Sequence, residues 1–127
     1  MKITLPLPPN MANSRLHWRV KNRKRKEYFE ACDLAAILVP VRERALLVRR
    51  APSIEKTMIR ATVYCGALHD EDNLLARLKF PVDWMVRRGF LKDDGPMQIS
   101  WYWPIEQVVK RGQDYRVEFE LTEVGRE

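Results

Sequence analysis

Proline positions constrain this 127-residue chain more than any other feature, because proline fixes the backbone φ angle and donates no backbone hydrogen bond. Residues 2–7 predict a short strand that is closed by Pro8 and Pro9. Pro6 favours an edge position or a strand end, since a central strand needs every backbone N–H. We expect residues 10–19 to form a loop.

Two helices separated by a proline are expected next. Asn22 could cap a helix that runs to about Leu38, and Pro40 should end it. A second helical stretch is predicted over residues 41–50, before Pro52. Apolar side chains gather near one face of the first helix: Tyr28, Phe29, Cys32, Ala35 and Ala36.

The middle of the chain predicts a strand followed by a helix. Residues 57–66 are rich in β-branched residues and predict a strand that Gly66 ends. Residues 70–88 predict a helix in two pieces, because Pro81 falls inside the helical pattern. Gly89 is suited to the C-terminus of that helix.

The last segments predict strands. Residues 97–103 and 115–122 alternate like half-buried strands, and residues 110–114 between them resemble a turn. The predicted order is β-α-(α)-β-α-β-β, without repeats or linkers. It favours a single domain over residues 1–127 of the α/β or α+β class, with helices packed on a small mixed sheet.

Charge is distributed unevenly along the chain, whose net charge is +6. Residues 1–69 carry 14 Lys and Arg against 5 Asp and Glu, whereas residues 70–127 carry 9 against 12. A basic half next to an acidic half predicts a polyanion-binding surface beside an acidic pocket. Charge alone leaves the alternative open that the basic helices are simply solvated.

Neither the N-terminal residues nor the cysteines point to export. No apolar run approaches the roughly 20 residues that span a bilayer, and the prolines near the start do not fit a signal peptide. We expect a cytoplasmic protein without membrane contact. Cys32 and Cys65 are then expected to be reduced and buried, because two distant cysteines make no metal-binding framework.

The densest polar cluster is the run from Asp70 to Asn73, followed by the pair Asp93-Asp94. Asp70 and Asp72 are two residues apart, so in an extended segment they point the same way. Asp94 lies just past the end of the same helix and can join them if the chain returns across the sheet. Three carboxylates tolerate one another best around a hard cation such as Mg²⁺.

The same residues also have a simpler interpretation. Acidic residues before an apolar pattern often cap a helix N-terminus, where they meet backbone N–H groups and the positive end of the helix dipole. The run Asp93-Asp94-Gly95 is likewise typical of a turn. Judged on local pattern alone, this structural interpretation is the stronger one.

Lys79 and a basic run are further candidates. Lys79 stands almost two helical turns after Asp72 and shares its face, so it could reach a phosphate oxygen; a solvated lysine is the alternative. Trp18 either stacks on an unpaired base or belongs to the core. The residues that we expect to contact DNA are Arg15, His17, Trp18, Arg19, Lys21, Arg23, Lys24, Arg25 and Lys26.

Several common catalytic patterns are missing from the sequence. It has no phosphate-binding Walker loop, no glycine-rich dinucleotide turn, no zinc-ligand spacing and no nucleophile elbow. Nucleotide hydrolysis, zinc chemistry and serine-hydrolase chemistry therefore lose support, and no nucleotide cofactor is expected.

Four motifs together resemble the RusA family of Holliday-junction resolvases, small endonucleases often encoded by phages and prophages. They are the starting run Leu5-Pro-Leu-Pro-Pro-Asn10, the run Asp70-Glu-Asp-Asn-Leu74, the pair Lys79 and Asp83, and the run Gly89-Phe-Leu-Lys-Asp-Asp94. The resemblance spans most of the chain, from residue 3 to about residue 122. It implies a RusA-like fold and a bacterial or phage-infected cell as the setting.

The resemblance also implies roles for single residues. Asp70 and Asp72 match the two metal-binding aspartates of the family pattern D-x-D-N, and Asp94 matches its third essential carboxylate. Mg²⁺ is the implied cofactor, with Mn²⁺ as a substitute. Asp93, Asn73 and His69 are expected to support these ligands.

Lys79 matches the catalytic lysine of the family only across a longer interval. The family lysine stands four residues after the second aspartate, and here the interval is seven. Both spacings keep the lysine on the same helix face, with a shift of about 4–5 Å along the axis. The basic segment from Val39 to Lys56 is also longer than expected, and no role follows for it.

The implied activity is symmetric nicking of branched DNA by a homodimer. A four-way junction presents two scissile phosphates related by a two-fold axis, and a two-fold dimer can place one acidic site at each. The acidic residues and Mg²⁺ would activate water and leave 5′-phosphate and 3′-hydroxyl ends, with Lys79 offsetting transition-state charge.

Two alternatives stay open at the level of sequence. One is a catalytically silent phage accessory protein that binds junctions without cutting them, which predicts salt-sensitive binding and no Mg²⁺-dependent product. The other is a metal-dependent phosphodiesterase directed at flaps, forks or RNA, with the same chemistry and a different docking surface.

Overall fold

The computed structural model describes residues 2–9, 18–37, 56–91 and 99–123. Several predictions fall outside these residues and keep their status as predictions: the helix at 41–50, Arg15, His17 and the pair Asp93-Asp94. The described elements, in chain order, are β1 (Lys2–Pro6), α1 (Trp18–Ile37), β2 (Thr57–Cys65), α3 (Glu71–Arg87), β3 (Ile99–Trp101), β4 (Glu106–Val109) and β5 (Arg116–Glu123).

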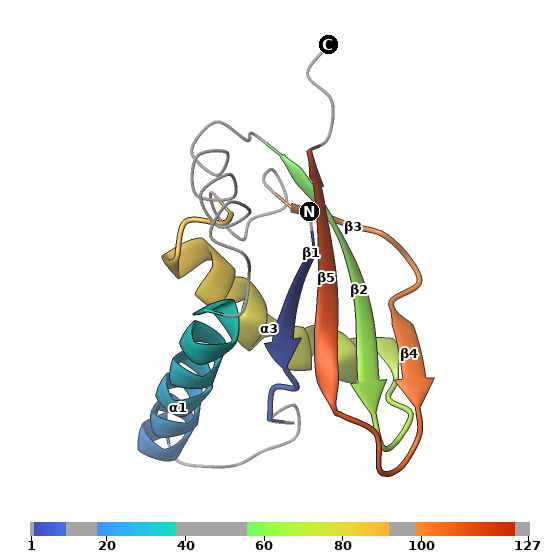
Figure 1. Cartoon of the computed structure of the whole chain (residues 1–127), viewed down its shortest axis with the longest axis horizontal. Coiled ribbons are helices and arrows are strands. Elements are labelled where there is room, and N and C mark those ends of the chain that lie inside the picture. Colours follow the sequence, from blue (N-terminus) through green and yellow to red (C-terminus); the bar gives the residue numbers. More distant parts are fainter. Residues whose placement is uncertain (1, 10–17, 38–55, 92–98, 124–127) are drawn as a thin grey trace.

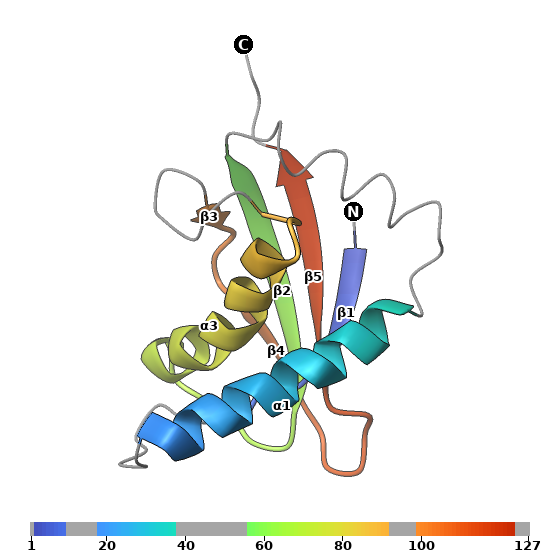
Figure 2. The same ribbon diagram turned by 90° about the vertical axis from the view of Figure 1, so that its left-hand side faces the viewer.

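These elements form one mixed five-stranded sheet with two helices on one of its faces (Figures 1 and 2). The strand order is β1-β5-β2-β3, and β4 also pairs with β2. β5 lies antiparallel between β1 and β2, whereas β3 and β4 both run parallel to β2. The predicted α/β or α+β class, a mixed sheet covered by helices, is confirmed.

Alternation along the strands explains why the helices cover only one face. In β2, Ile59, Ala61 and Val63 are buried, and Val117 and Phe119 of β5 lie on the same side. The opposite side of β2 carries Arg60, Thr62 and Tyr64 instead, none of which is buried. Since one face is apolar and the other polar, only the apolar face needs cover.

The first strand agrees with its sequence pattern. Ile3 and Leu5 of β1 are buried, whereas Lys2 and Thr4, which alternate with them, are exposed. Among the described strands, β1 pairs with β5 alone, so it lies at an edge, and Pro6 is its last residue. The prediction that Pro6 marks an edge strand or a strand end is confirmed on both counts.

The edge of β2 opposite β5 is shared by two short strands, of which the sequence predicted one. β3 pairs with residues 57–59 and β4 with residues 62–65. Pro104 lies between them and has no N–H to give to the sheet, which accounts for the interruption. β4 escaped prediction because its four residues are exposed or half-buried and show no apolar alternation.

α1 begins at Trp18, four residues before the predicted cap Asn22. The correction has a simple cause: the Arg, Val and Lys residues before Asn22 tolerate a helix, and asparagine does not stop one. No residue from 18 to 27 is buried, whereas Tyr28, Phe29 and Cys32 are. The first half of α1 is therefore a solvated basic segment, and only the second half packs into the core.

α3 is one continuous helix, so the prediction of two pieces is wrong. Pro81 removes one hydrogen bond from the helix, at a typical cost of about 3 kcal/mol. It is itself buried, between Leu78 and Val82, which are buried as well. Packing on both sides of the proline keeps the helix together.

α3 ends just before Gly89, as the sequence predicted. Gly89 has a φ of 82°, the left-handed conformation that glycine adopts most easily. The N–H of Phe90 donates to Met85 O at 2.8 Å and the N–H of Gly89 donates to Val86 O at 3.1 Å, which is a Schellman motif. Phe90 also packs on Trp84, with the ring centroids 5.3 Å apart.

Both cysteines are buried and free, as predicted. Cys32 belongs to α1 and Cys65 ends β2. Burial raises the pKa of the Cys32 thiol to about 12, so it stays protonated at neutral pH and behaves as a small apolar core residue.

Candidate functional site

The acidic cluster lies at the N-terminus of α3, after the loop that follows β2. Asp70 is the N-cap residue, and its Oδ1 accepts a hydrogen bond of 2.9 Å from the N–H of Asn73. Asp72 is exposed in the first helical turn. The interpretation of Asp70 as a helix cap is confirmed.

The predicted alignment of the two carboxylates is corrected. Asp70 has extended backbone angles (φ −73°, ψ 168°), whereas Asp72 is already helical. The two side chains therefore do not alternate along one extended segment, because the change of backbone conformation falls between them. They remain two exposed carboxylates within one turn of the helix start.

A network of hydrogen bonds fixes the residue before this cluster. The N–H of His69 donates to Gln107 Oε1, and Gln107 Nε2 donates to the carbonyl of His69, both at 2.9 Å. Gln107 belongs to β4. The start of α3 is thereby attached to the sheet edge through two hydrogen bonds of the Gln107 side-chain amide.

Arg77 connects the same site to the N-terminal segment. Its Nε donates to the carbonyl of Pro8 at 2.7 Å, and its Nη1 lies 3.0 Å from Nε2 of His69. Since a guanidinium only donates, a hydrogen bond at this contact needs Nε2 of His69 as its acceptor. Partial burial lowers the pKa of Arg77, which stays charged because arginine titrates far above neutral pH.

Sequence reasoning missed both Arg77 and Gln107. Their partners lie 69, 8 and 38 residues away along the chain. No local sequence pattern predicts hydrogen bonds between residues this far apart. Only His69 had been linked to the acidic cluster, on the ground that it is adjacent.

Lys79 lies on α3, exposed, and on the face that also carries Asp72 and Ala76. Because α3 has no break, the interval of seven positions from Asp72 to Lys79 spans about 10 Å of helix axis. Lys79 lines a groove of about 500 Å³ between α1 and α3, together with Lys21 and Ala76. The predicted sharing of a face is confirmed.

The donor set at the helix start suits a hard cation. Asp70 and Asp72 offer carboxylate oxygens, which are the ligands that Mg²⁺ prefers, and both side chains are exposed. Among the residues that the structure describes, no three His, Cys, Asp or Glu side chains gather as a metal cluster. The expected third ligand, Asp94, and its neighbour Asp93 lie outside those residues.

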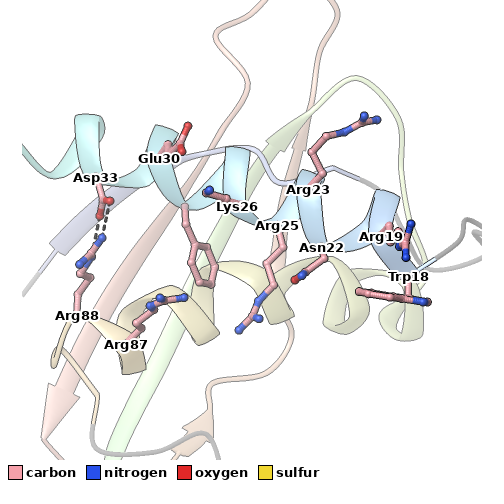
Figure 3. Close-up of a pocket in the computed structure, with 11 residues that line it drawn as sticks. Trp18, Arg19, Asn22, Arg23, Arg25, Lys26, Glu30, Asp33, Arg87 and Arg88 are labelled. Carbon is pink, nitrogen blue, oxygen red and sulfur yellow. Dashed lines mark hydrogen bonds and ion pairs between the residues drawn. The ribbon is translucent and has the colours of Figure 1, made fainter.

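A larger groove of about 600 Å³ runs between α1 and α3 and is strongly cationic (Figure 3). Glu30 and Asp33 are its only acidic residues among the described lining. Its six cationic residues are Arg19, Arg23, Arg25, Lys26, Arg87 and Arg88. Arg87 and Arg88 come from the end of α3, and sequence reasoning had assigned them no contact with DNA.

Two guanidinium groups from opposite helices converge on one aromatic ring in this groove. Arg25 lies over the ring of Phe29, 4.9 Å from its centroid, and Arg87 lies 5.8 Å from the same centroid. Nη2 of Arg25 is also 3.9 Å from Oδ2 of Asp83 on α3. Arg25 is therefore a wall of the groove that bridges the two helices.

The far end of the groove is closed by Asp33. Its Oδ1 accepts hydrogen bonds from Nε1 of Trp84 at 2.9 Å and from Nε of Arg88 at 2.8 Å, and its Oδ2 pairs with Nη2 of Arg88 (Figure 3). The hydrogen bonds from Arg88 hold the pKa of the Asp33 carboxyl below its usual value. The charge of Arg88 is thus largely balanced within the protein.

The remaining predicted DNA contacts lie where a polyanion can reach them. Trp18 is 64 % exposed, so the alternative that it belongs to the core is wrong. Arg19, Lys21, Arg23, Lys24 and Lys26 are all on the solvated first half of α1 and none is buried. Nothing in the structure describes Arg15 or His17.

No protein-family model matches the chain, and no curated protein matches it. Neither α1 nor α3, the two described helices, is long and apolar enough to cross a membrane.

Proposed function

We propose that this protein is a magnesium-dependent endonuclease that resolves Holliday junctions and related branched DNA by paired nicks in phosphodiester bonds. One observation carries the proposal: a single helix, α3, joins two kinds of chemistry. It presents the exposed carboxylates of Asp70 and Asp72 at its start, and the face of Asp72 continues to Lys79 in a cationic groove. Carboxylates suit Mg²⁺ and cations suit DNA phosphates.

Asp70 and Asp72 would hold the ion, with Asp94 as the expected third ligand. Bound Mg²⁺ supplies Lewis-acid chemistry that activates water and offsets negative charge on phosphate oxygens. The cap bond from the amide of Asn73 orients the carboxylate of Asp70 at the helix start. The ammonium of Lys79 would offset charge on the phosphate during bond cleavage.

A nicking assay on a synthetic four-way junction tests the proposal. We expect Mg²⁺-dependent products that end in 5′-phosphate and 3′-hydroxyl, and an Asp72→Asn protein that cuts at least about 100-fold more slowly. Even outer partners of metal ligands typically contribute about 10- to 100-fold. Glu71→Gln is the matched control, because Glu71 is an exposed acid of the same helical turn outside the proposed ligand set.

Asp70→Asn separates the cap from the proposed metal ligand. Asparagine caps helices as well as aspartate does, so we expect unchanged thermal stability and a loss of nicking comparable to that of Asp72→Asn. Equal cutting by both asparagine variants and the unaltered protein would refute the assignment of these residues.

A panel of four-way, forked, flapped and linear DNA then identifies the preferred substrate. We expect the four-way junction to be cut fastest, because a pair of related sites fits its two-fold symmetry. Preferential cutting of flaps, or junction binding without any product under the same conditions, would instead support one of the two alternative functions.

A further inference from the structure

Two grooves meet along one side of α1. The larger, of about 600 Å³, and the smaller, of about 500 Å³, share three lining residues of α1: Trp18, Asn22 and Arg25. From α3, the second groove is lined by Ala76, Lys79 and Phe80, of which Lys79 is the cation. The first groove extends to Arg87 at the end of α3. Together the grooves make a continuous basic track along the junction of the two helices.

The cations of this track divide into two groups. Arg25 and Arg88 form ion pairs between the helices, with Asp83 and Asp33, so they build the walls. The larger groove has four other cations and only one other described acid, Glu30. These cations are Arg19, Arg23, Lys26 and Arg87. Arg23 pairs only loosely, at 3.9 Å, with the exposed Glu27, and a phosphate can displace such a surface contact at little cost.

An aromatic side chain stands at the shared ridge between the two grooves. Trp18 is 64 % exposed, and the guanidinium of Arg19 lies 5.5 Å from its ring centroid. An exposed indole next to cations is a platform on which a nucleic-acid base can stack. Bases of a duplex are covered by their neighbours, so this platform can serve only an unpaired base.

We propose that the grooves between α1 and α3 bind an unpaired DNA strand, with its phosphates on Arg19, Arg23 and Arg87 and one base stacked on Trp18. This inference rests on the proposed function, since it takes DNA to be the substrate. It names the feature of branched DNA that is recognised: unpaired nucleotides, which forks and flaps carry and which a four-way junction exposes when base pairs at its crossover open. It adds Arg87 of α3 to a binding surface that the sequence had placed on residues 15–26.

Binding of a fluorescein-labelled oligodeoxythymidylate, measured by anisotropy in EDTA, tests the proposal without any nuclease reaction. We expect the single strand to bind more tightly than a duplex of the same length. Trp18→Ala should weaken binding about 5-fold or more, the effect typical of a lost base stack. Trp103→Ala is the matched control, because Trp103 is also half-exposed but lies between β3 and β4.

The salt dependence tests the phosphate contacts separately. Each lost contact to a single strand reduces the slope of log K against log salt concentration by about 0.7. We expect this reduction for Arg87→Ala and no change for Arg111→Ala, an exposed arginine in the turn before β5. Duplex binding as tight as single-strand binding, or equal effects of the test and control variants, would overturn the proposal.

The two proposals fail in different ways. Strand binding that depends on Trp18 and Arg87, with no cutting of any branched DNA, would refute the nuclease and leave the strand site supported. Cutting that depends on Asp72, without strand binding in EDTA, would refute the strand site alone.

Discussion

At the scale of single residues, the structure is held by polar side chains that join distant parts of the chain. Asp33 binds both Trp84 and Arg88, and so connects α1 to the end of α3. Arg77 performs the same task for Pro8 and His69. The bond from Trp84 to Asp33 satisfies an indole N–H that would otherwise lose its hydrogen bond on burial.

The ion pair of Asp33 predicts a pH dependence of stability. The folded state lowers the pKa of Asp33, chiefly through its hydrogen bonds from Arg88. Its contribution is therefore fully present above the pKa of the unfolded carboxyl, about 3.9, and is lost as the pH falls through the lower folded pKa. We expect Asp33→Asn to reduce the free energy of unfolding at pH 7 by about 1 kcal/mol, after allowance for solvent screening.

Denaturant unfolding of both proteins between acid and neutral pH measures this difference. Asparagine can still accept the hydrogen bond from Trp84, so the change reports the lost charge. The stabilities of the two proteins should converge at the acid end, and Glu27→Gln, at an exposed and loose ion pair, should have no measurable effect. A constant difference at every pH would contradict the role of the charge.

At the scale of elements, α3 organises the candidate site. Its first turn presents Asp70 and Asp72, its middle presents Lys79, and its last turn presents Arg87 to the cationic groove. Its other face is held by the buried side chains of Leu74, Leu78, Val82 and Met85. The position of every candidate group on α3 therefore depends on one helix of unbroken geometry.

The end of α3 gives a test at this scale. Gly89 has a φ of 82°, and no atom of the residues that the structure describes lies within 4 Å of a Cβ added there. An alanine side chain would clash with none of these residues. The left-handed backbone alone would destabilise the folded state, by about 1 kcal/mol. We expect Gly89→Ala to lower the free energy of unfolding by about that amount, and Gly89→Asn by less, because asparagine tolerates this conformation. Equal stability of all three proteins in denaturant melts would contradict the Schellman cap.

At the scale of the whole molecule, the proposed activity requires two acidic sites for the two scissile phosphates of a junction. We expect a homodimer, with a mass in sedimentation experiments of twice the 15.1 kDa of the chain. Cleavage of a junction on a circular plasmid should then give paired nicks within one binding event. A monomer at every concentration at which the junction is cut, with unpaired nicks, would contradict the symmetric mechanism.

The sequence by itself determined the two described helices, every described strand except β4, the apolar face of the sheet, and the acidic start of α3. These features follow from short-range patterns: the β-branched residues of 57–66, the alternation of 115–122, the glycine after α3, and the carboxylates at its start. The same reasoning placed the start of α1 too late and divided α3 at Pro81, because a local rule cannot weigh the packing on either side.

Only the tertiary structure decided which of these parts meet. It brought Arg87 and Arg88 of α3 beside the basic half of α1, paired β4 with β2, and tied His69 to Gln107 and Arg77. The physical reason is that these contacts join residues far apart in the chain, and their energies depend on the packing of the core that brings them together. The acidic residues of α3 could be chosen from the sequence, but the groove beside them exists only once the two helices pack on one sheet.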